Sequence, residues 1–499
     1  MTSVLDRVRR AVPTPASHVQ AWGRRVPAVR AALGAAPRPP APVSGLAALA
    51  GALDDVVDHR DRGHVWLVLA GLTGRLPDHT TVVEVTRAAE FDDGASLWAA
   101  VARRTTTASA RRQVRIAVDE VLVDVAHTAR TPLATGIQRV ARETTRRWLA
   151  GRECTPVSWS DGYESIRELT TTERSRFGST APGTTEEPAQ TTVVVPWRCT
   201  YVVAELAAEQ ERSARLLALA ALTPNRTGVI GFDCVPLTSA ETTQLGFAGV
   251  FAGNLAAVRH FDRVATISQA AATEYSGWRS MLGAVGMSGP AIASVPLPVE
   301  AEEPTEEDLA DARTRFQIGS LPLVLVVGSH EPRKNHLTVL HAAELLWREG
   351  LRFSLSFVGG NSWGSDSFSR HLAELQRAGR PVDTESRLSD GQLWAAYRLA
   401  RCTVFPSLNE GFGLPVAESL AVGTPAITSD FGSMREIAAD GGALTIDPHD
   451  DHALAAAMRR LLTDDALREG LRRAALARPP RTWDMYADEV WNFLVSDPA

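Results

Sequence analysis

Cysteine is scarce in this sequence, and its placement excludes several classes of protein. Only four cysteines occur among 499 residues, and no two of them form a C-x-x-C pair. A disulfide framework needs many cysteines in a short chain, and a structural zinc site usually needs a C-x-x-C pair, so neither is expected. We interpret the four as reduced thiols of a cytoplasmic protein: Cys154, Cys199, Cys234 and Cys402.

Long apolar runs are also missing. No stretch reaches the roughly 18 consecutive apolar residues that a transmembrane helix requires. Arg9 and Arg10 precede A-V-P-T-P and not an apolar signal core, so we expect no export. The net charge of −6 argues against general nucleic-acid binding. What remains is the composition of a soluble globular protein, with 44% hydrophobic and 22% charged residues.

The N-terminal segment is locally basic. Its first 38 residues contain seven arginines against Asp6 alone. Four valine and leucine residues between positions 4 and 12 could share one helical face, and a basic amphipathic helix can rest on anionic lipid. The alternative is a poorly ordered tail that is broken by Pro13 and Pro15.

Shifts in composition divide the chain into segments, and its length favours two or three domains. The predicted segments are 1–43 as a basic tail with a Pro-rich linker, 44–112 as an accessory and mainly helical module, 113–300 as a Rossmann-like domain, 301–320 as a linker, 321–482 as a second Rossmann-like domain, and 483–499 as an amphipathic helix.

Short apolar strands alternate with helices in both Rossmann-like segments, which indicates parallel sheets with covered faces. Residues 114–125 have the pattern of a strand, a helix is expected to begin at Gly136, and the polar segment 170–192 is predicted to be a mobile loop. The other expected strands are 192–195, 228–232, 263–267, 321–327, 353–358, 382–386, 402–405, 425–428 and 443–446.

The most informative stretch is N-E-G-F-G-L-P-V-A-E at 409–418. It follows a short buried strand and leads into a helix at 415–422, with Pro415 in the first turn, where a missing N–H costs nothing. Glu410 is therefore expected in a strand-to-helix loop, and Glu418 about two turns into the helix. Carboxylates accept hydrogen bonds from hydroxyls, while glycines and a helix N-terminus admit anionic oxygens.

This motif resembles the E-x7-E pattern of retaining GT-B glycosyltransferases of family 4. The segment G-S-H-E-P-R-K-N at 328–335 is similar to the loop of that family that meets the donor diphosphate, and T-G-I-Q-R-V at 135–140 resembles a segment of its acceptor-side domain. The similarity covers roughly residues 113–499. It implies an α/β protein of GT-B fold, in which two Rossmann-like domains face a cleft and the C-terminal helix crosses back onto the first domain.

The resemblance also implies roles for the two glutamates. Glu418 would hold the ribose hydroxyls of a nucleotide. Glu410 would position the donor sugar and support an oxocarbenium-like state, without attacking as a nucleophile. The backbone N–H groups of Phe412, Gly413 and Leu414 would face the sugar and phosphate. The alternative for Glu418 is an ordinary glutamate on a solvated helix surface.

A departing diphosphate needs positive charge, and this fold uses side chains and helix dipoles where other enzymes use a required metal. Lys334 and Arg333 fit that task, beside Gly328 at a strand end. Many members carry an arginine directly after that glycine, whereas Ser329 follows it here. The alternative is a basic helix start on the surface.

Gly136 would let the diphosphate approach a helix N-terminus across the cleft. The alternative is a tight turn. Arg139 lies one turn further on and could face the cleft or solvent.

One departure from the family concerns the transferred sugar. The strand end G-F-D-C-V-P at 231–236 resembles a site where many relatives carry H-D-x-x-P, with the histidine supporting the sugar. Phe232 replaces that histidine here, while Asp233 and Pro236 remain. Either a different sugar is bound, or a group such as His330 substitutes, or activity is reduced. A satisfied loop histidine is the alternative for His330.

Two further candidate site residues, Ser268 and Trp363, each allow two interpretations. Ser268 resembles a strand-end serine of the family, but a helix N-cap explains it equally well. Trp363 lies in a loop that the family places near the nucleotide base, and core packing is the alternative.

The sequence therefore predicts a retaining hexosyltransferase that moves a sugar, mannose by family resemblance, from a nucleotide diphosphate to a glycan, lipid-linked or small-molecule acceptor. No cofactor and no metal are expected. Its place would be cytoplasmic, at the inner face of the membrane if the basic N-terminus contacts lipid. The alternative is a catalytically silent nucleotide-binding scaffold in a polysaccharide-assembly complex.

Overall fold

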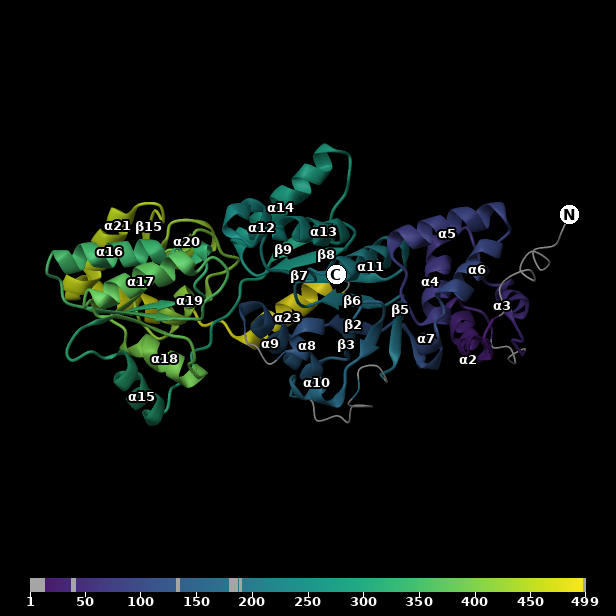
Figure 1. Cartoon of the computed structure of the whole chain (residues 1–499), viewed down its shortest axis with the longest axis horizontal. Coiled ribbons are helices and arrows are strands. Elements are labelled where there is room, and N and C mark those ends of the chain that lie inside the picture. The colour runs from purple at the N-terminus through teal and green to yellow at the C-terminus, as the bar shows by residue number, and fades with distance from the viewer. Residues whose placement is uncertain (1–13, 37–41, 132–134, 179–186, 188–190, 497–499) are drawn as a thin grey trace.

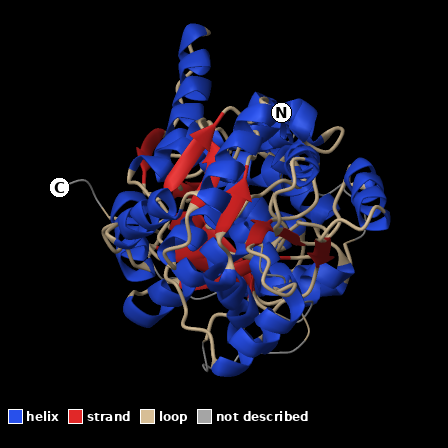
Figure 2. Cartoon of the chain, turned by 90° about the vertical axis from the view of Figure 1, so that its left-hand side faces the viewer, coloured by secondary structure: helices blue, strands red, loops and turns tan. Residues whose placement is uncertain are grey.

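The computed structural model describes residues 14–36, 42–131, 135–178, 187 and 191–496. Within them the chain forms an elongated molecule with three parts in a row: a helical module, a first α/β domain and a second α/β domain (Figure 1). Helices surround the strands when the molecule is seen along its long axis (Figure 2). The predicted α/β class, with two Rossmann-like domains and an N-terminal helical extension, is confirmed.

The N-terminal module packs directly on the first sheet. Its central helix α4 is apolar on all sides and almost wholly buried, because other helices cover it on one side and strands on the other. A Cβ atom at Gly71 would lie 2.9 Å from Val29 and 3.4 Å from Ile116, so this glycine permits the close approach. The helices are α2 (Ala16–Ala32), α3 (Leu46–Leu53), α4 (Arg62–Thr73), α5 (His79–Phe91), α6 (Ala95–Arg104) and α7 (Thr107–Arg111).

Residues 16–32, predicted as part of a basic tail, instead form helix α2 and pack in this module. Arg25 is buried and donates hydrogen bonds to the carbonyls of Leu72, Ser109 and Arg112. Arg30 pairs with Asp55. The guanidinium groups of these arginines donate to carbonyls and a carboxylate within the module, and they are therefore not part of a basic tail. Composition alone does not predict such contacts. The more N-terminal arginines, at positions 7, 9 and 10, lie outside the described residues.

The first domain contains a sheet in the order β1-β5-β4-β3-β2-β6-β7-β8-β9, parallel except for β4. Its strands are β1 (Val114–Val118), β2 (Val121–Asp124), β3 (Thr155–Trp159), β4 (Ile166–Glu168), β5 (Val193–Trp197), β6 (Thr200–Val203), β7 (Arg226–Gly231), β8 (Arg263–Thr266) and β9 (Ala291–Ser294). Its helices are α8 (Ala126–Arg130), α9 (Gly136–Gly151), α10 (Thr171–Ser175), α11 (Gln210–Leu222), α12 (Val235–Thr238), η2 (Ala240–Thr242), α13 (Phe247–Val258) and α14 (Gln269–Ala284).

The strand pattern at 114–125 is confirmed, but it corresponds to two strands. β1 and β2 are separated by three other strands in the same sheet. The chain turns at Asp119, whose φ of 56° is in the left-handed region that aspartate tolerates better than apolar residues do. The alternation of apolar residues alone did not reveal this break.

The predicted loop at 170–192 is partly helical. Thr170 caps α10 through a capping box with Glu173, and Glu173 forms a buried ion pair of 2.7 Å with Arg167. This internal charge pairing allows a polar segment to pack. Residues 179–186 and 188–190 of the same segment lie outside the described residues.

The second domain contains a parallel sheet in the order β12-β11-β10-β13-β14-β15. Its strands are β10 (Leu323–Val327), β11 (Ser354–Val358), β12 (Val382–Glu385), β13 (Cys402–Phe405), β14 (Ala426–Ser429) and β15 (Ala443–Ile446), which confirms the expected positions. Its helices are α15 (Glu306–Phe316), η3 (Pro332–Lys334), α16 (His336–Arg348), α17 (Asp366–Arg377), α18 (Asp390–Leu399), α19 (Leu414–Ala421), α20 (Gly432–Ala439), α21 (Asp451–Thr463) and α22 (Asp465–Leu476).

The C-terminal helix α23 (Trp483–Leu494) lies on the first domain (Figure 1). The Trp148 indole donates to the carbonyl of Ala487 at 2.9 Å, and its ring meets Trp491 edge-on at 5.4 Å between centroids. Gly228 of β7 lies against Leu494. The crossing back that the resemblance implied is therefore confirmed.

Candidate functional site

The 409–418 stretch lies where the two domains meet, between the end of β13 and the start of α19. Gly413 has φ 101°, a conformation that favours glycine, and it precedes the first helical residue, Leu414. Pro415 follows in the first turn. Glu410 lies in the loop and Glu418 in the second turn of α19, as predicted.

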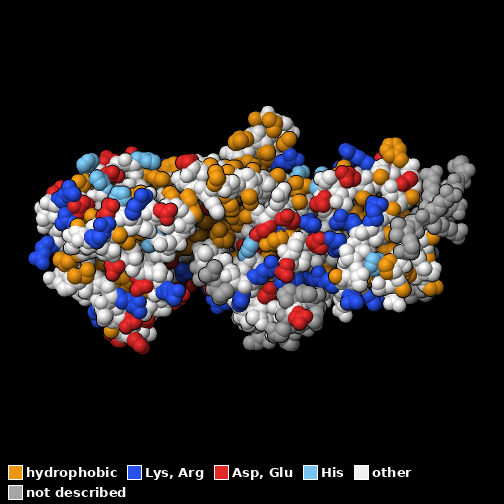
Figure 3. All heavy atoms as spheres, in the orientation of Figure 1, with side chains coloured by type: hydrophobic (Ala, Val, Ile, Leu, Met, Phe, Trp, Pro, Cys, Tyr) orange, Lys and Arg blue, Asp and Glu red, His pale blue; other side chains and the backbone are white. Residues whose placement is uncertain are grey.

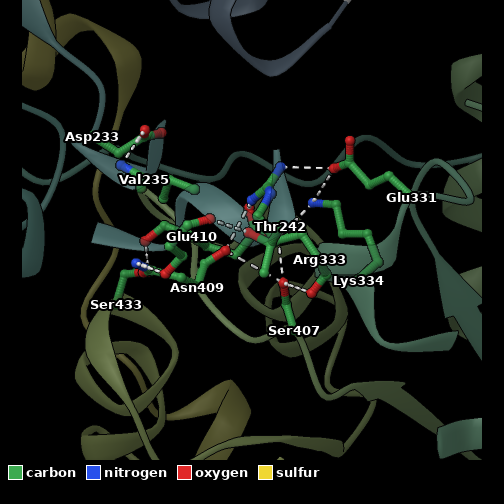
Figure 4. A network of polar contacts seen from close by, with 12 residues as sticks. Asp233, Val235, Thr242, Glu331, Arg333, Lys334, Ser407, Asn409, Glu410 and Ser433 are labelled. Atoms are coloured by element: carbon green, nitrogen blue, oxygen red, sulfur yellow. Dashed lines mark hydrogen bonds and ion pairs between the residues drawn. The ribbon is translucent and has the colours of Figure 1, made fainter. Parts of the chain in front are cut away.

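Glu410 is the centre of a charged cluster (Figure 4). Its carboxylate accepts hydrogen bonds from Lys334 Nζ and Arg333 Nη1, both at 2.5 Å, and from Ser407 Oγ at 2.7 Å. Burial alone would raise the pKa of Glu410, but the positive charges of Arg333 and Lys334 outweigh it and lower this pKa to about 2. Glu410 is thus an anion at any physiological pH and cannot serve as a proton donor.

Lys334 is the only lysine among the 52 lysine and arginine residues of the chain. Its stem lies along Gly328, whose φ of 147° favours glycine, and its ammonium lies 5.0 Å from the centre of the Phe405 ring. The slot between a glycine and an aromatic face suits a compact ammonium better than a planar guanidinium.

Arg333 and Glu331 extend the charged cluster. Arg333 donates to Glu331 at 2.7 Å and to the carbonyl of Asn409 at 2.9 Å, in addition to Glu410. Glu331 also accepts from the indole of Trp363 at 3.2 Å. No role was predicted for Glu331, although it lies in the 328–335 motif beside Arg333 and Lys334.

The two domains touch at Gly411. A Cβ atom there would lie 2.5 Å from the carbonyl oxygen of Phe232 and 2.9 Å from Asp233 Oδ2, so only glycine allows this contact. Burial raises the pKa of Asp233 to about 6, and the negative charge of Glu274 adds to this while Arg333 opposes it. The Phe232–Asp233 strand end therefore lies beside the Glu410 loop, as the resemblance implied.

Polar contacts hold this loop to the first domain. Ser268 caps α14 and also donates to the carbonyl of Gly411 at 2.6 Å, so the N-cap interpretation is confirmed and a loop contact is added. Asn409 donates to Glu274 at 3.2 Å. Glu436 accepts from the first two N–H groups of α14, both at 3.0 Å. Asn409, Glu274 and Glu436 were missed, since nothing local in the sequence links positions so far apart.

Glu418 is buried and does not lie on a solvated surface. Its carboxylate accepts from Arg139 Nη1 at 2.8 Å and from the Tyr397 hydroxyl at 2.9 Å. Burial raises the pKa of Glu418 above its usual value, although Arg139 opposes this. Arg139 thus faces the cleft, and Tyr397 of α18 is a further partner of Glu418 that no motif predicted.

Two helix N-termini meet beside this pair. Gly136 begins α9, and a Cβ atom there would lie 3.4 Å from Leu414, the first residue of α19. Among the described residues, the N–H groups of Phe412, Gly413 and Leu414 donate to no acceptor in the protein. Unpaired N–H groups of this kind can bind an anionic oxygen.

A cavity of about 280 Å³ opens next to the cluster. Arg333, Glu331 and Trp363 line it from the second domain. The first domain contributes Phe232 and Asp233 together with an apolar wall, which consists of Ile137, Leu206, Val235, Pro236, Phe247, Phe251 and Tyr275. It can therefore hold a small molecule against charged groups on one side and apolar groups on the other.

His330 does not line that cavity. Its Nδ1 is 2.9 Å from Asn361 Oδ1, and its ring lies 4.4 Å from the ring of Phe368. Burial lowers the pKa of His330. It is a packed histidine of the second domain, so the interpretation in which it replaces the histidine missing at Phe232 has no support in the geometry.

The fold and the cleft define the class: two Rossmann-like domains, with the Glu410 cluster between them and a C-terminal helix crossing back, make this a GT-B protein. Residues 311–478 match the family "Glycosyl transferases group 1". Residues 311–478, which lie in the second α/β domain with part of the segment before it, are therefore similar to this family, and the fold of the chain is GT-B.

Two curated relatives from Escherichia coli are mannosyltransferases by name. The chain is 33% identical over 180 residues to O-antigen chain mannosyltransferase B, a match that covers 36% of this chain and 47% of the relative. It is 27% identical over 347 residues to the serotype-specific mannosyltransferase WbdA, covering 66% of this chain and 41% of the relative. The chain thus spans less than half the length of both relatives.

Solved structures share the fold. Anabaena HepE in complex with UDP and glucose superposes with a TM-score of 0.55 at 13% identity, covering 76% of this chain and all of that one. WaaG, a glycosyltransferase involved in lipopolysaccharide biosynthesis, gives a TM-score of 0.52 at 15% identity, covering 75% of this chain and all of WaaG.

Proposed function

We propose that this protein is a retaining glycosyltransferase that moves a hexose, with mannose as the first candidate, from a nucleotide diphosphate to a glycan, lipid-linked or small-molecule acceptor. One observation carries the proposal: an ionised Glu410 is held between Lys334 and Arg333, and Arg333 lines a cavity between the two domains. The names of the two Escherichia coli relatives support mannose.

The chemistry follows from the charges of this cluster. When the bond between sugar and phosphate breaks, negative charge grows on the leaving diphosphate and positive charge on the sugar. Lys334 keeps two donors beyond its bond to Glu410, and with Arg333 and the free N–H groups at 412–414 it would stabilise the diphosphate. The anionic Glu410 would orient sugar hydroxyls and stabilise the oxocarbenium-like centre. No covalent intermediate is required.

The test is a panel of nucleotide sugars, with released nucleoside diphosphate and glycosylated product detected by mass spectrometry. We expect turnover with one donor, and retention of anomeric configuration in the product by NMR. Inversion would contradict the retaining assignment. Nucleotide binding without any turnover would favour the alternative, a catalytically silent scaffold in a polysaccharide-assembly complex, for which the phenylalanine at 232 is the motivating feature.

Glu418→Gln is expected to weaken binding of the nucleoside diphosphate by about ten- to a hundredfold. An ionised acceptor for hydroxyl donors is worth about 1.5–3 kcal/mol, and an amide retains shape but not charge. Isothermal titration measures the change, with Glu303→Gln as a matched control because the Glu303 side chain is 84% exposed. An affinity equal to that of the parent would refute the ribose role.

Phe232→His is expected to shift donor preference toward fully hydroxylated sugars. The Phe232 ring lines the cavity, and a sugar hydroxyl left against it without a partner costs about 1–3 kcal/mol. The parent should therefore use a donor whose sugar lacks the hydroxyl at that position better than the matching hydroxylated donor, mannose included. The measurement is the ratio of kcat/KM for deoxy and hydroxylated donors in parent and variant, and an unchanged ratio would mean that Phe232 does not contact the sugar.

The pH dependence should report Asp233. Because its pKa is about 6, we expect kcat/KM to rise through pH 6 as a second anion forms beside the sugar site. The folded state holds this proton to higher pH than the unfolded chain does, so the contribution of Asp233 to stability falls as pH rises from about 4 to 6. Asp233→Asn should flatten both profiles, and a variant that keeps the inflection near pH 6 would assign it to another group.

We also propose a cytoplasmic location at the inner face of the membrane. Among the described residues, no helix is long and apolar enough to cross a bilayer. Mixed charge covers much of the face in Figure 3, and apolar side chains gather on the outer end of α14, where Met281 is exposed. Contact through the basic N-terminus remains a prediction, which sedimentation with anionic vesicles can check for the chain with and without residues 1–13.

A further inference from the structure

Arg139 reaches from the first domain to the second. It lies one turn into α9, and its guanidinium donates to Glu418 of α19 across the cleft at 2.8 Å. The side chain of Arg139 is 31% exposed and that of Glu418 is 8% exposed, so the pair lies at the cleft edge with the carboxylate inside.

The guanidinium has donors to spare. Of its five N–H donors, the contact with Glu418 uses one, and the described residues provide no other hydrogen-bond partner. A planar guanidinium can hold a carboxylate on one edge and a phosphate on another. The orientation of the Glu418 carboxylate is fixed in this arrangement, because its second oxygen accepts a hydrogen bond from the Tyr397 hydroxyl at 2.9 Å.

The surroundings favour an anion at this place. The Leu414 side chain at the start of α19 approaches Gly136 at the start of α9, so the two helix N-termini lie near each other, and each presents the positive end of a helix dipole. An anionic ligand at the N-terminus of α9 would be about one helical turn from Arg139. No acidic residue other than Glu418 forms an ion pair with Arg139 among the described residues.

We infer that Arg139 is a donor-binding residue supplied by the first domain, whose guanidinium bridges Glu418 and a phosphate oxygen of the nucleotide diphosphate. The inference rests on the proposed function. Since Arg139 and Glu418 belong to different domains, both domains contribute to this phosphate contact. Arg139 therefore determines specificity for phosphorylated nucleosides, while Glu418, which the Tyr397 hydroxyl holds in place, serves the ribose.

The experiment compares two ligands by isothermal titration: the nucleoside diphosphate that the parent binds most tightly, and the matching nucleoside without phosphates. Arg139→Gln should weaken the diphosphate about 10- to 100-fold, and the nucleoside by less than about threefold, because the glutamine amide can still donate to Glu418. Arg139→Lys should restore part of the loss. The control is Arg146→Gln on the same helix, whose side chain is 50% exposed and should leave both affinities unchanged.

Three outcomes would overturn the inference. Equal losses for both ligands would mean that Arg139 only positions Glu418. Tighter binding by Arg139→Gln would mean that Arg139 competes with the ribose. Unchanged binding would mean that Arg139 has no part in the site. Thermal unfolding of each variant verifies the fold, and Arg139→Lys provides the comparison if the glutamine variant is unstable. Failure of the parent to bind any nucleoside diphosphate would instead refute the proposed function.

Discussion

Lys334→Ala is expected to lower kcat by about a hundred- to a thousandfold, with a smaller loss of donor affinity. One electrostatic contact that strengthens in the transition state is worth about 2.7–4 kcal/mol, and charge on the leaving diphosphate is largest there. The ammonium already lies in a slot between Gly328 and the Phe405 ring, so it needs little reorganisation. Steady-state kinetics with the preferred donor measures both parameters.

Lys334→Arg sharpens this test. All other lysine or arginine positions of the chain are arginine, and a planar guanidinium cannot reproduce the compact ammonium beside Gly328 and the Phe405 ring. We therefore expect the arginine variant to recover less than about a tenth of parental kcat, a loss of at least about 1.4 kcal/mol. Arg348→Ala is the control, since that side chain is 73% exposed. Full activity of Lys334→Arg would show that charge alone matters.

Glu410→Gln is expected to reduce turnover by about a hundredfold or more while the protein still binds nucleoside diphosphate. The substitution removes an anion whose pKa is about 2 from between two cations at 2.5 Å, so the sugar loses its orienting carboxylate. Stability should fall as well, because breaking a buried ion pair typically costs about 3–5 kcal/mol. Kinetics and thermal unfolding are measured on the same sample.

The control for this variant is Glu303→Gln, at an exposed pair. Normal turnover by a folded Glu410→Gln variant would remove Glu410 from the reaction. Loss of nucleotide affinity equal to the loss of turnover would mean that Glu410 serves binding only.

Local sequence signals predicted the second domain well. Its strands are buried apolar runs, and its site loop is marked by Gly411, Gly413 and Pro415, whose conformational limits restrict the structure on their own. The positions of Glu410 and Glu418 followed from these marks. The clustering of Lys334 with Glu410 followed from the resemblance, and the strand order β11-β10-β13 places their two loops side by side.

Long-range pairing was beyond such signals. The split of 114–125 into β1 and β2 depends on three strands that insert between them, and the packing of α2 depends on carbonyls that Arg25 meets about 50 to 90 residues later along the chain. Tyr397 has no motif, and it meets Glu418 only because α18 lies beside α19. Residues of this kind become visible once tertiary contacts are known.

The most direct test of the account is transfer from a nucleotide sugar in the presence of EDTA, for the parent and for Lys334→Ala. In the proposed mechanism, Lys334, Arg333 and helix N-termini stabilise the charge of the diphosphate. We therefore expect the parent to keep its activity in EDTA, and the variant to keep its lowered kcat when magnesium or manganese is added. Activity that disappears in EDTA and returns with either metal would contradict the central claim.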